Sequence, residues 1–218
     1  MDNCVQIYGD GLPNKCIYKN LLQFLDESFS TFKFPKESDG SFKKSEDEIT
    51  KALVHHMDRT QELKSGHFKF NNQEPTSKVD VGVYMGRDYD DRNTTPFFVI
   101  EAKRLPTPKS SQRDPNEYVY ITPQIKGHGG IERFKMEKHG KGHAEAAMFG
   151  YIQDGTSPLD WKDRINEIIR DVAKSRKDFW SEDEILRDST LIPNRFYSTH
   201  SRISEEPILL WHFFEQEK

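Results

Sequence analysis

The sequence predicts a mixed α/β domain. Segments whose apolar residues recur at helical spacing are interspersed with short segments that alternate or run apolar, as strands do. Aromatic residues make up 12% of the 218-residue chain and can supply a core, although 31% of the residues are charged. No obvious linker divides the chain, so we expect one domain over residues 1–218, ordered helix, helix, three strands, helix, strand, helix and two strands.

Two amphipathic helices are expected first, over residues 15–29 and 46–63. In each, apolar side chains recur close to the helical repeat and so line one face. The second helix begins at the sequence SEDE, where Ser45 and Glu48 match the pattern of a capping box.

Three strands are expected next, over residues 67–71, 78–85 and 97–103. The first places Phe68 and Phe70 on one side, and the second alternates three valines with other residues. The third begins as a continuous apolar run, which is typical of a central strand buried on both faces.

The second half of the chain is expected to hold two helices and three strands. A short helix over residues 130–137 precedes a strand over 146–153. A longer amphipathic helix over 160–179 follows, with two strands, 195–203 and 208–215, after it.

Three charged residues interrupt the apolar strands: Asp80, Glu101 and Lys103. Residues two apart in a strand share a face, so Glu101 and Lys103 point the same way, and antiparallel pairing brings Asp80 beside Glu101. Two neighbouring carboxylates repel each other, and a divalent cation such as Mg²⁺, which prefers oxygen ligands, removes that conflict. Lys103 is then close enough to orient or deprotonate a metal-bound water. The alternative is a strand-end ion pair between Lys103 and Glu101, with Asp80 capping a turn.

This pattern resembles the PD-(D/E)XK nuclease superfamily. The matching residues are Asp80 in KVDVGVY and Glu101, Ala102 and Lys103 in FFVIEAKRL. Val79 stands where that superfamily has a proline before the Asp.

The order of elements also matches the resemblance, which spans residues 46–153 approximately. It implies a restriction-endonuclease-like core of helix, three strands, helix and strand (αβββαβ), with a mixed sheet flanked by helices. The N-terminal helix over 15–29 and the helix and two strands within 157–218 are then additions to that core.

The resemblance further implies a metal-dependent phosphodiesterase, a deoxyribonuclease acting in restriction, phage defence or repair. Mg²⁺ or Mn²⁺ would be held by Asp80, Glu101 and the backbone carbonyl of Ala102, with Lys103 at the attacking water. Glu48 matches an acidic residue that many members carry on the preceding helix, and it would be a further catalytic residue and metal ligand. Its competing role is the capping box alone. A non-catalytic module of the same fold, binding nucleic acid or a partner protein, is the alternative function.

A basic, glycine-rich segment, KGHGGIERFKMEKHGKGH, covers residues 126–143 and holds five Lys or Arg against two Glu. Such side chains suit phosphate contacts, with a solvated loop as the alternative. His139 and His143 have helical i,i+4 spacing, but the glycines between them argue against a helical zinc site. The candidate nucleic-acid contacts are Lys126, Arg133, Lys135, Lys138 and Lys141.

The whole-chain composition limits the partners. The net charge is −4, so no overall basic field announces nucleic acid, and an anionic partner must meet a local patch. Cys4 and Cys16 predict neither a zinc motif nor a disulfide framework. Without a secretory signal or an apolar run of membrane-spanning length, we expect a soluble, cytoplasmic protein. Its expected partner is nucleic acid, DNA rather than RNA, with room for a homodimer or a partner subunit.

Overall fold

A computed structural model describes residues 15–39, 45–63, 68–72, 79–86, 95–106, 116–122, 129–204 and 206–216. Its helices and strands follow the predicted order, with one additional short strand, β5. In chain order they are α1 (Lys15–Thr31), α2 (Glu46–Leu63), β1 (Phe68–Asn72), β2 (Val81–Met85), β3 (Phe98–Leu105), α3 (Gly130–Lys135), β4 (Glu145–Ile152), α4 (Pro158–Ser175), β5 (Arg187–Asp188), β6 (Phe196–His200) and β7 (Ile208–Gln216).

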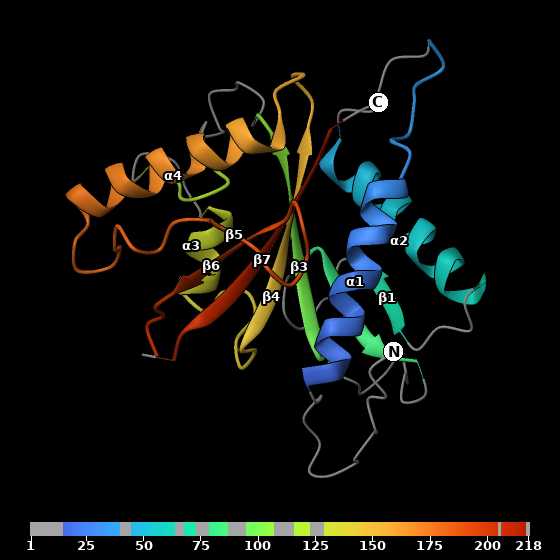
Figure 1. Cartoon of the computed structure of the whole chain (residues 1–218), viewed down its shortest axis with the longest axis horizontal. Coiled ribbons are helices and arrows are strands. Elements are labelled where there is room, and N and C mark those ends of the chain that lie inside the picture. The colour runs from blue at the N-terminus through green and yellow to red at the C-terminus, as the bar shows by residue number, and fades with distance from the viewer. Residues whose placement is uncertain are drawn as a thin grey trace.

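A seven-stranded mixed sheet forms the centre, in the order β1-β2-β3-β4-β7-β6-β5. The central strands β3, β4 and β7 are parallel to one another, and both flanks are antiparallel. Helices α1 and α2 cover one face of this sheet, and α3 and α4 cover the other (Figure 1). The predicted α/β class, with a mixed sheet flanked by helices, is therefore confirmed.

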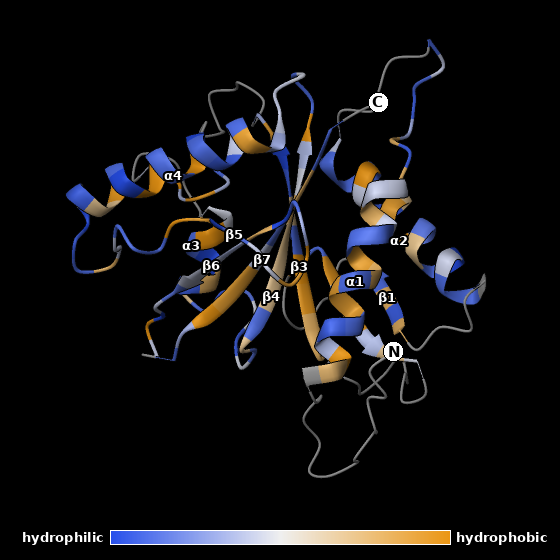
Figure 2. Ribbon diagram, in the orientation of Figure 1, coloured by the Kyte–Doolittle hydropathy of each residue, from blue (hydrophilic) through white to orange (hydrophobic). Residues whose placement is uncertain are grey.

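Each face of the sheet has its own apolar core. Ile100 and Ala102 of β3 face α1 and α2, whereas Val99 faces α3 and α4. Hydrophobic residues run along the strands and the inner sides of the helices, while the outer side of α4 is polar (Figure 2). Because side chains alternate along β3, Glu101 and Lys103 share the face of Val99.

Several predicted boundaries shift by a few residues. The helix expected over 160–179 starts earlier, because Ser157 caps it by accepting a hydrogen bond from the Asp160 amide. It ends at Ser175, where the chain turns at Arg176. Cys16, in the first turn of α1, is disulfide-bonded, which the cysteine spacing did not predict. In the part of the chain that the structure describes, no helix has the length and apolarity to cross a membrane.

The short helix α3 lies directly against an earlier backbone segment. Its first amides, from Gly130 to Glu132, donate hydrogen bonds to the carbonyls of residues 117–119, at 2.8 to 3.0 Å. Gly129 makes this approach feasible, because a Cβ there would lie 2.4 Å from the Cα of Tyr120 and 2.5 Å from its amide nitrogen. This contact fixes the position of α3 relative to β3.

Replacing Gly129 with Ala is expected to lower the free energy of unfolding by roughly 2 to 3 kcal/mol, since the new methyl group meets backbone that cannot rotate away. Gly142→Ala is the control, because its Cβ meets open space. The alanine at 142 would be strained only by the backbone φ of 79°, which lowers the free energy of unfolding by about 1 kcal/mol. Urea unfolding of both variants measures the difference, and equal losses would show that α3 does not depend on this contact.

Candidate active site

The candidate site lies where β2 separates from β3. The two strands pair from Val83 opposite Phe98 to Val81 opposite Ile100, and no further. Beyond that point two amides of β3 bond to carboxylates instead of a strand. Asp80 Oδ2 accepts from the amide of Ala102 at 2.7 Å, and Glu46 Oε2 accepts from the amide of Arg104 at 3.1 Å. Two acidic side chains are thus drawn to the open edge of β3 by its backbone donors.

The ammonium of Lys103 lies among three oxygen atoms beside this edge. Its Nζ is 2.8 Å from Glu101 Oε1, 2.8 Å from the carbonyl oxygen of Ala102 and 3.2 Å from Glu46 Oε1. The side chain is only 4% exposed. Burial alone would lower the pKa of Lys103, but Glu101, Glu46 and Asp80 outweigh it and hold the pKa above its usual range. The lysine is therefore a cation in the metal-free protein.

Glu101 is fully buried and contacts the side chains of Lys103, Arg133 and His139. Arg133 NH1 donates to Oε1 at 2.8 Å, beside the Lys103 ammonium. His139 Nδ1 lies 2.9 Å from Oε2, an ion pair whenever the ring is protonated, although the ring is not aligned for a hydrogen bond. Burial would raise the pKa of Glu101, but Lys103, His139 and Arg133 together hold it well below its usual range. Glu101 is therefore ionised.

Asp80 is the opposite case. Burial, followed by the neighbouring Glu101 carboxylate, raises the pKa of Asp80 from 3.8 to about 8. At neutral pH Asp80 is mostly protonated, and the remaining charges of Glu101 and Glu46 are balanced by Lys103 and Arg133. The crowding expected between Asp80 and Glu101 is thus relieved by a proton in the metal-free protein.

The structure brings three sequence-predicted residues together, namely Asp80, Glu101 and Lys103. Asp80 was expected inside the second strand. In the structure it lies in the bend immediately before β2. From there its carboxylate reaches across to β3, and it takes the place that a longer strand would occupy.

Glu48 is exposed in the first turn of α2, whereas Glu46, two residues before it, contacts Lys103. Residues two apart on a helix point in different directions, so Glu46 is the α2 carboxylate that the structure brings to Lys103. The role expected of Glu48 at the metal stays a prediction. The fully buried Ile49 and Leu53 mark the inward face of α2, and Glu46 lies three and seven residues before them. That periodicity in the sequence could have identified Glu46.

The donor atoms suit Mg²⁺ or Mn²⁺, because carboxylates and a backbone carbonyl are the oxygen ligands these ions prefer. As the side chains stand, however, no three His, Cys, Asp or Glu residues among those described converge closely enough to hold a metal. The Lys103 ammonium occupies the space between the oxygens. The oxygen atoms of the site therefore fit a divalent cation, although in this structure the Lys103 ammonium lies between them.

Lys135 was predicted to contact phosphate, and this is wrong. Its side chain is fully buried and donates to both oxygens of Glu184, at 2.6 and 2.7 Å. The ammonium also lies 4.9 Å from the ring centres of Phe179 and Trp180. A lysine on the inward side of α3 cannot reach a nucleic acid, and the sequence alone did not show which side of this short helix faces the core.

The other basic residues of the segment are placed differently. Arg133 binds Glu101 but keeps 31% of its side chain exposed. Lys138 and Lys141 are exposed in the turns after α3, so their phosphate contacts stay a prediction. Lys126 lies outside the described residues.

A chain of buried polar groups continues from Glu184 under α3 and α4. His200 Nδ1 lies 3.6 Å from Glu184 Oε2, and both His200 Nε2 and His212 Nε2 lie 2.7 Å from Ser198 Oγ. His212 Nδ1 is 2.8 Å from the hydroxyl of Tyr118. Burial lowers the pKa of both histidines, and that of His212 lies well below 6.5. No substrate can reach these fully buried groups, so the chain is structural.

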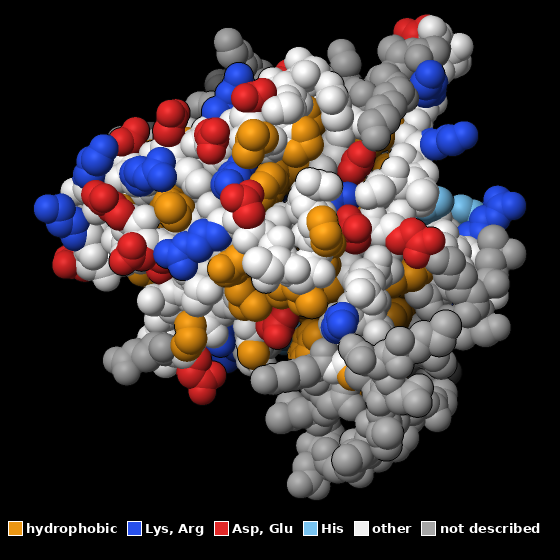
Figure 3. Space-filling model, viewed as in Figure 1, with side chains coloured by type: hydrophobic (Ala, Val, Ile, Leu, Met, Phe, Trp, Pro, Cys, Tyr) orange, Lys and Arg blue, Asp and Glu red, His pale blue; other side chains and the backbone are white. Residues whose placement is uncertain are grey.

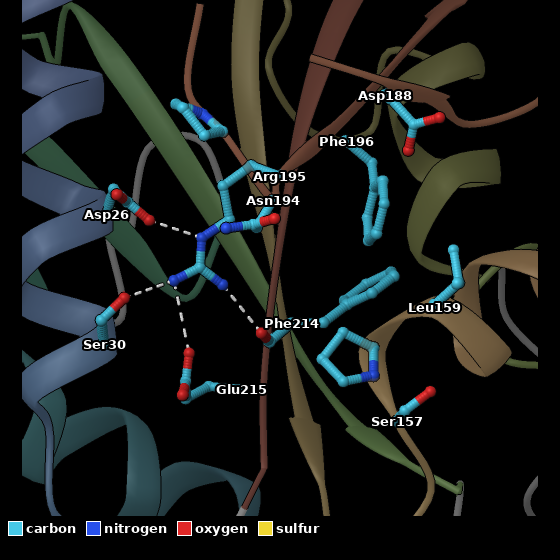
Figure 4. Close-up of a pocket in the computed structure, with 12 residues that line it drawn as sticks. Asp26, Ser30, Ser157, Leu159, Asp188, Asn194, Arg195, Phe196, Phe214 and Glu215 are labelled. Carbon is cyan, nitrogen blue, oxygen red and sulfur yellow. Dashed lines mark hydrogen bonds and ion pairs between the residues drawn. The ribbon is translucent and has the colours of Figure 1, made fainter. Parts of the chain in front are cut away.

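A separate pocket of about 610 Å³ opens between α1 and the start of α4. Apolar side chains gather on this side of the molecule, with carboxylates around them (Figure 3). Arg195 crosses the pocket wall to Asp26, Ser30, Glu215 and the Phe214 carbonyl (Figure 4). None of the described residues lining the pocket belongs to the charged cluster on β3. These contacts hold the guanidinium in the wall of the pocket.

Comparison with known proteins finds no family model, no curated protein and no solved structure that matches this chain. The functional assignment therefore rests on the residues and their geometry.

The buried histidines should make the protein acid-sensitive. An unfolded chain protonates His212 below its ordinary pKa of 6.5, whereas the folded protein keeps it neutral. Unfolding then takes up a proton, so the free energy of unfolding falls as the pH falls below 6.5, by up to about 1.4 kcal/mol per pH unit from this group.

His212→Gln keeps hydrogen-bonding capacity but cannot titrate, so its stability should fall less steeply with acid than that of the wild type. Urea unfolding between about pH 5 and 7.5 measures this slope. His55→Gln, which replaces an exposed histidine on α2, is the control for the substitution itself. Parallel curves for the wild type and His212→Gln would contradict the argument.

Proposed function

We propose that this protein is a metal-dependent nuclease that hydrolyses phosphodiester bonds of DNA, with the charged cluster on β3 as its active site. One observation carries the proposal. Asp80, Glu101 and Lys103 come together with the Ala102 carbonyl where β2 leaves β3. Glu101 and Lys103 are buried there, although charged groups rarely are, and Asp80 is partly buried. Perturbed carboxylates packed around a cation are typical of functional sites.

The element order supports the same proposal. The run α2, β1, β2, β3, α3, β4 follows the order of the PD-(D/E)XK core, with β1 to β3 antiparallel and β4 parallel to β3. We therefore propose that the core is restriction-endonuclease-like. Two departures accompany it: Val79 in place of a proline, and Glu46 in the position expected of Glu48.

In this proposal Asp80, Glu101, Glu46 and the Ala102 carbonyl would hold Mg²⁺ or Mn²⁺. Bound there, the metal supplies Lewis-acid stabilisation of the phosphoryl oxygens and a more acidic water. Asp80 gives up its proton so that its carboxylate can serve the cation. Arg133 and His139 keep the Glu101 carboxylate oriented from α3 and the turn that follows.

Lys103 would act beside the metal. In the metal-free protein Glu101, Glu46 and Asp80 hold its pKa above the usual range, so the side chain is cationic there. As a cation it would stabilise negative charge that grows on the phosphate in the transition state. Arg133, partly exposed beside it, offers further donors to the same phosphate.

A non-catalytic nucleic-acid or protein-binding module is the second candidate. The observation that favours it is that the cluster is balanced in charge without a metal, with Glu101 fully buried. A purely structural cluster of this kind would bind no divalent cation and cut no DNA, so the two functions differ in measurable ways.

Asp80→Asn is the sharpest test of the enzyme. Because Asp80 is largely protonated in the metal-free protein at neutral pH, Asn mimics it, and the variant should unfold at the wild-type temperature. Its cleavage of linear and circular, single- and double-stranded DNA with Mg²⁺ or Mn²⁺ should fall about a hundredfold or more, because a metal ligand is lost. Wild type in EDTA should be inactive. Cleavage by Asp80→Asn at the wild-type rate, or none by the wild type with either ion, contradicts the proposal.

Glu46→Gln and Glu48→Gln form a matched pair on one helical turn. Both remove one negative charge near the start of α2, so their effects on the helix dipole are alike. Glu46→Gln should lower the cleavage rate or raise the Mg²⁺ concentration needed for half-maximal rate, whereas Glu48→Gln should keep wild-type values for both. If the Glu48 variant loses activity and the Glu46 variant does not, the assignment of Glu46 is wrong.

A further inference from the structure

The Lys103 ammonium is fully satisfied by oxygen. An ammonium has three N–H donors, and Nζ has three oxygen neighbours, one each from Glu101, Ala102 and Glu46. They come from the side chain of one β3 residue, the backbone of the next and the start of α2. This is a coordination shell built around one cation.

The same three oxygens are among the ligands that the proposed function assigns to the divalent cation. Lys103 Nζ already lies 2.8 to 3.2 Å from each of these three atoms, so a divalent ion bound to them would lie directly beside the ammonium. A divalent ion placed beside an ammonium in a buried site is strongly repelled by it. The lysine and the metal therefore exclude each other from these atoms.

We propose that the Lys103 ammonium occupies the cation position of the metal-free site, and that a divalent metal ion binds by displacing it. This inference rests on the proposed function. It explains how buried carboxylates remain compensated before a metal arrives. It also means that the site contains a competitor for its own metal, so metal affinity is lowered by a residue that catalysis needs.

The alternative is that Lys103 stays in place and the metal binds outside it. Lys103 would then anchor Glu101 and Glu46, and removing it would leave metal affinity unchanged or reduced, since the carboxylates lose their anchor. Displacement requires the opposite sign, a gain in affinity when the lysine is removed.

Isothermal titration calorimetry with Mg²⁺ and Mn²⁺ on the full chain, without DNA, tests the sign. Lys103→Met keeps the length of the side chain without its charge and should bind metal about tenfold tighter or better, because one positive charge leaves the ligand set. Arg133→Met is the matched control. It removes a cation from the same Glu101 oxygen, but it leaves the Lys103 ammonium beside the Ala102 carbonyl and Glu46. It should gain less than Lys103→Met.

The outcomes separate the two proposals. A larger gain in Lys103→Met than in Arg133→Met supports displacement, as does binding by Lys103→Met when the wild type binds too weakly to measure. Wild-type binding with no gain in Lys103→Met, or equal gains in both variants, overturns displacement and leaves the proposed function standing. If neither ion binds to the wild type or to either variant, the proposed function fails and displacement fails with it.

A measurement on the wild type covers the case in which Lys103→Met does not fold. In protein labelled with ¹³C and ¹⁵N at lysine, the Lys103 side-chain signals should shift on saturation with Mg²⁺, because the ammonium leaves its three oxygen partners. Lys174 on α4, which is exposed and pairs with Asp171 rather than with the cluster, should not respond. Unchanged Lys103 signals in a protein that has bound Mg²⁺ overturn the inference.

Discussion

The ionised carboxylate of Glu101, buried without access to water, is the constraint on which this structure depends. A buried charge is tolerated only when it is paired and hydrogen-bonded. Here the partners come from β3 itself, from α3 and from the turn after α3. The close contact of α3 with residues 117–119, which Gly129 permits, is what carries Arg133 to Glu101. The position of α3 and of the turn that follows it therefore supplies two of the three partners of this buried charge.

The two faces of the sheet are built differently. The face under α1 and α2 is joined by aromatic contacts, such as the stacked rings of Phe29 and Phe149 with centres 4.6 Å apart. The face under α3 and α4 carries two buried polar systems, the one around Glu101 and the chain that begins at Lys135. Buried ion pairs add little net stability compared with apolar packing. Because these ion pairs are concentrated on one face, that face serves to hold charged and polar side chains in fixed positions. The opposite face supplies the apolar packing that stabilises the fold.

The charge state of the cluster connects stability with the proposed chemistry. A neutral Asp80 and a cationic Lys103 keep the metal-free site balanced, so the fold needs no metal to compensate Glu101. In the proposed function a divalent cation breaks this balance on binding: Asp80 would lose a proton and Lys103 would leave its oxygens. The affinity of such a site for metal depends on the free-energy difference between the metal-bound state and the metal-free state. The residues that stabilise the metal-free state therefore lower the metal affinity.

The sequence by itself determined the class of the fold and the centre of the candidate site. Periodicity fixed the order of helices and strands, because helical and strand spacings are local properties of the chain. The pleat of β3 put Glu101 and Lys103 on one face, and the antiparallel approach of β2 brought Asp80, in the bend before it, to the same place. Only the tertiary structure decided that Glu46 rather than Glu48 faces the site, that Lys135 is buried, and that Arg133 and His139 contact Glu101. These depend on how α2 and α3 are rotated against the sheet, and that rotation is set by packing among residues far apart in the sequence, which local spacing does not encode.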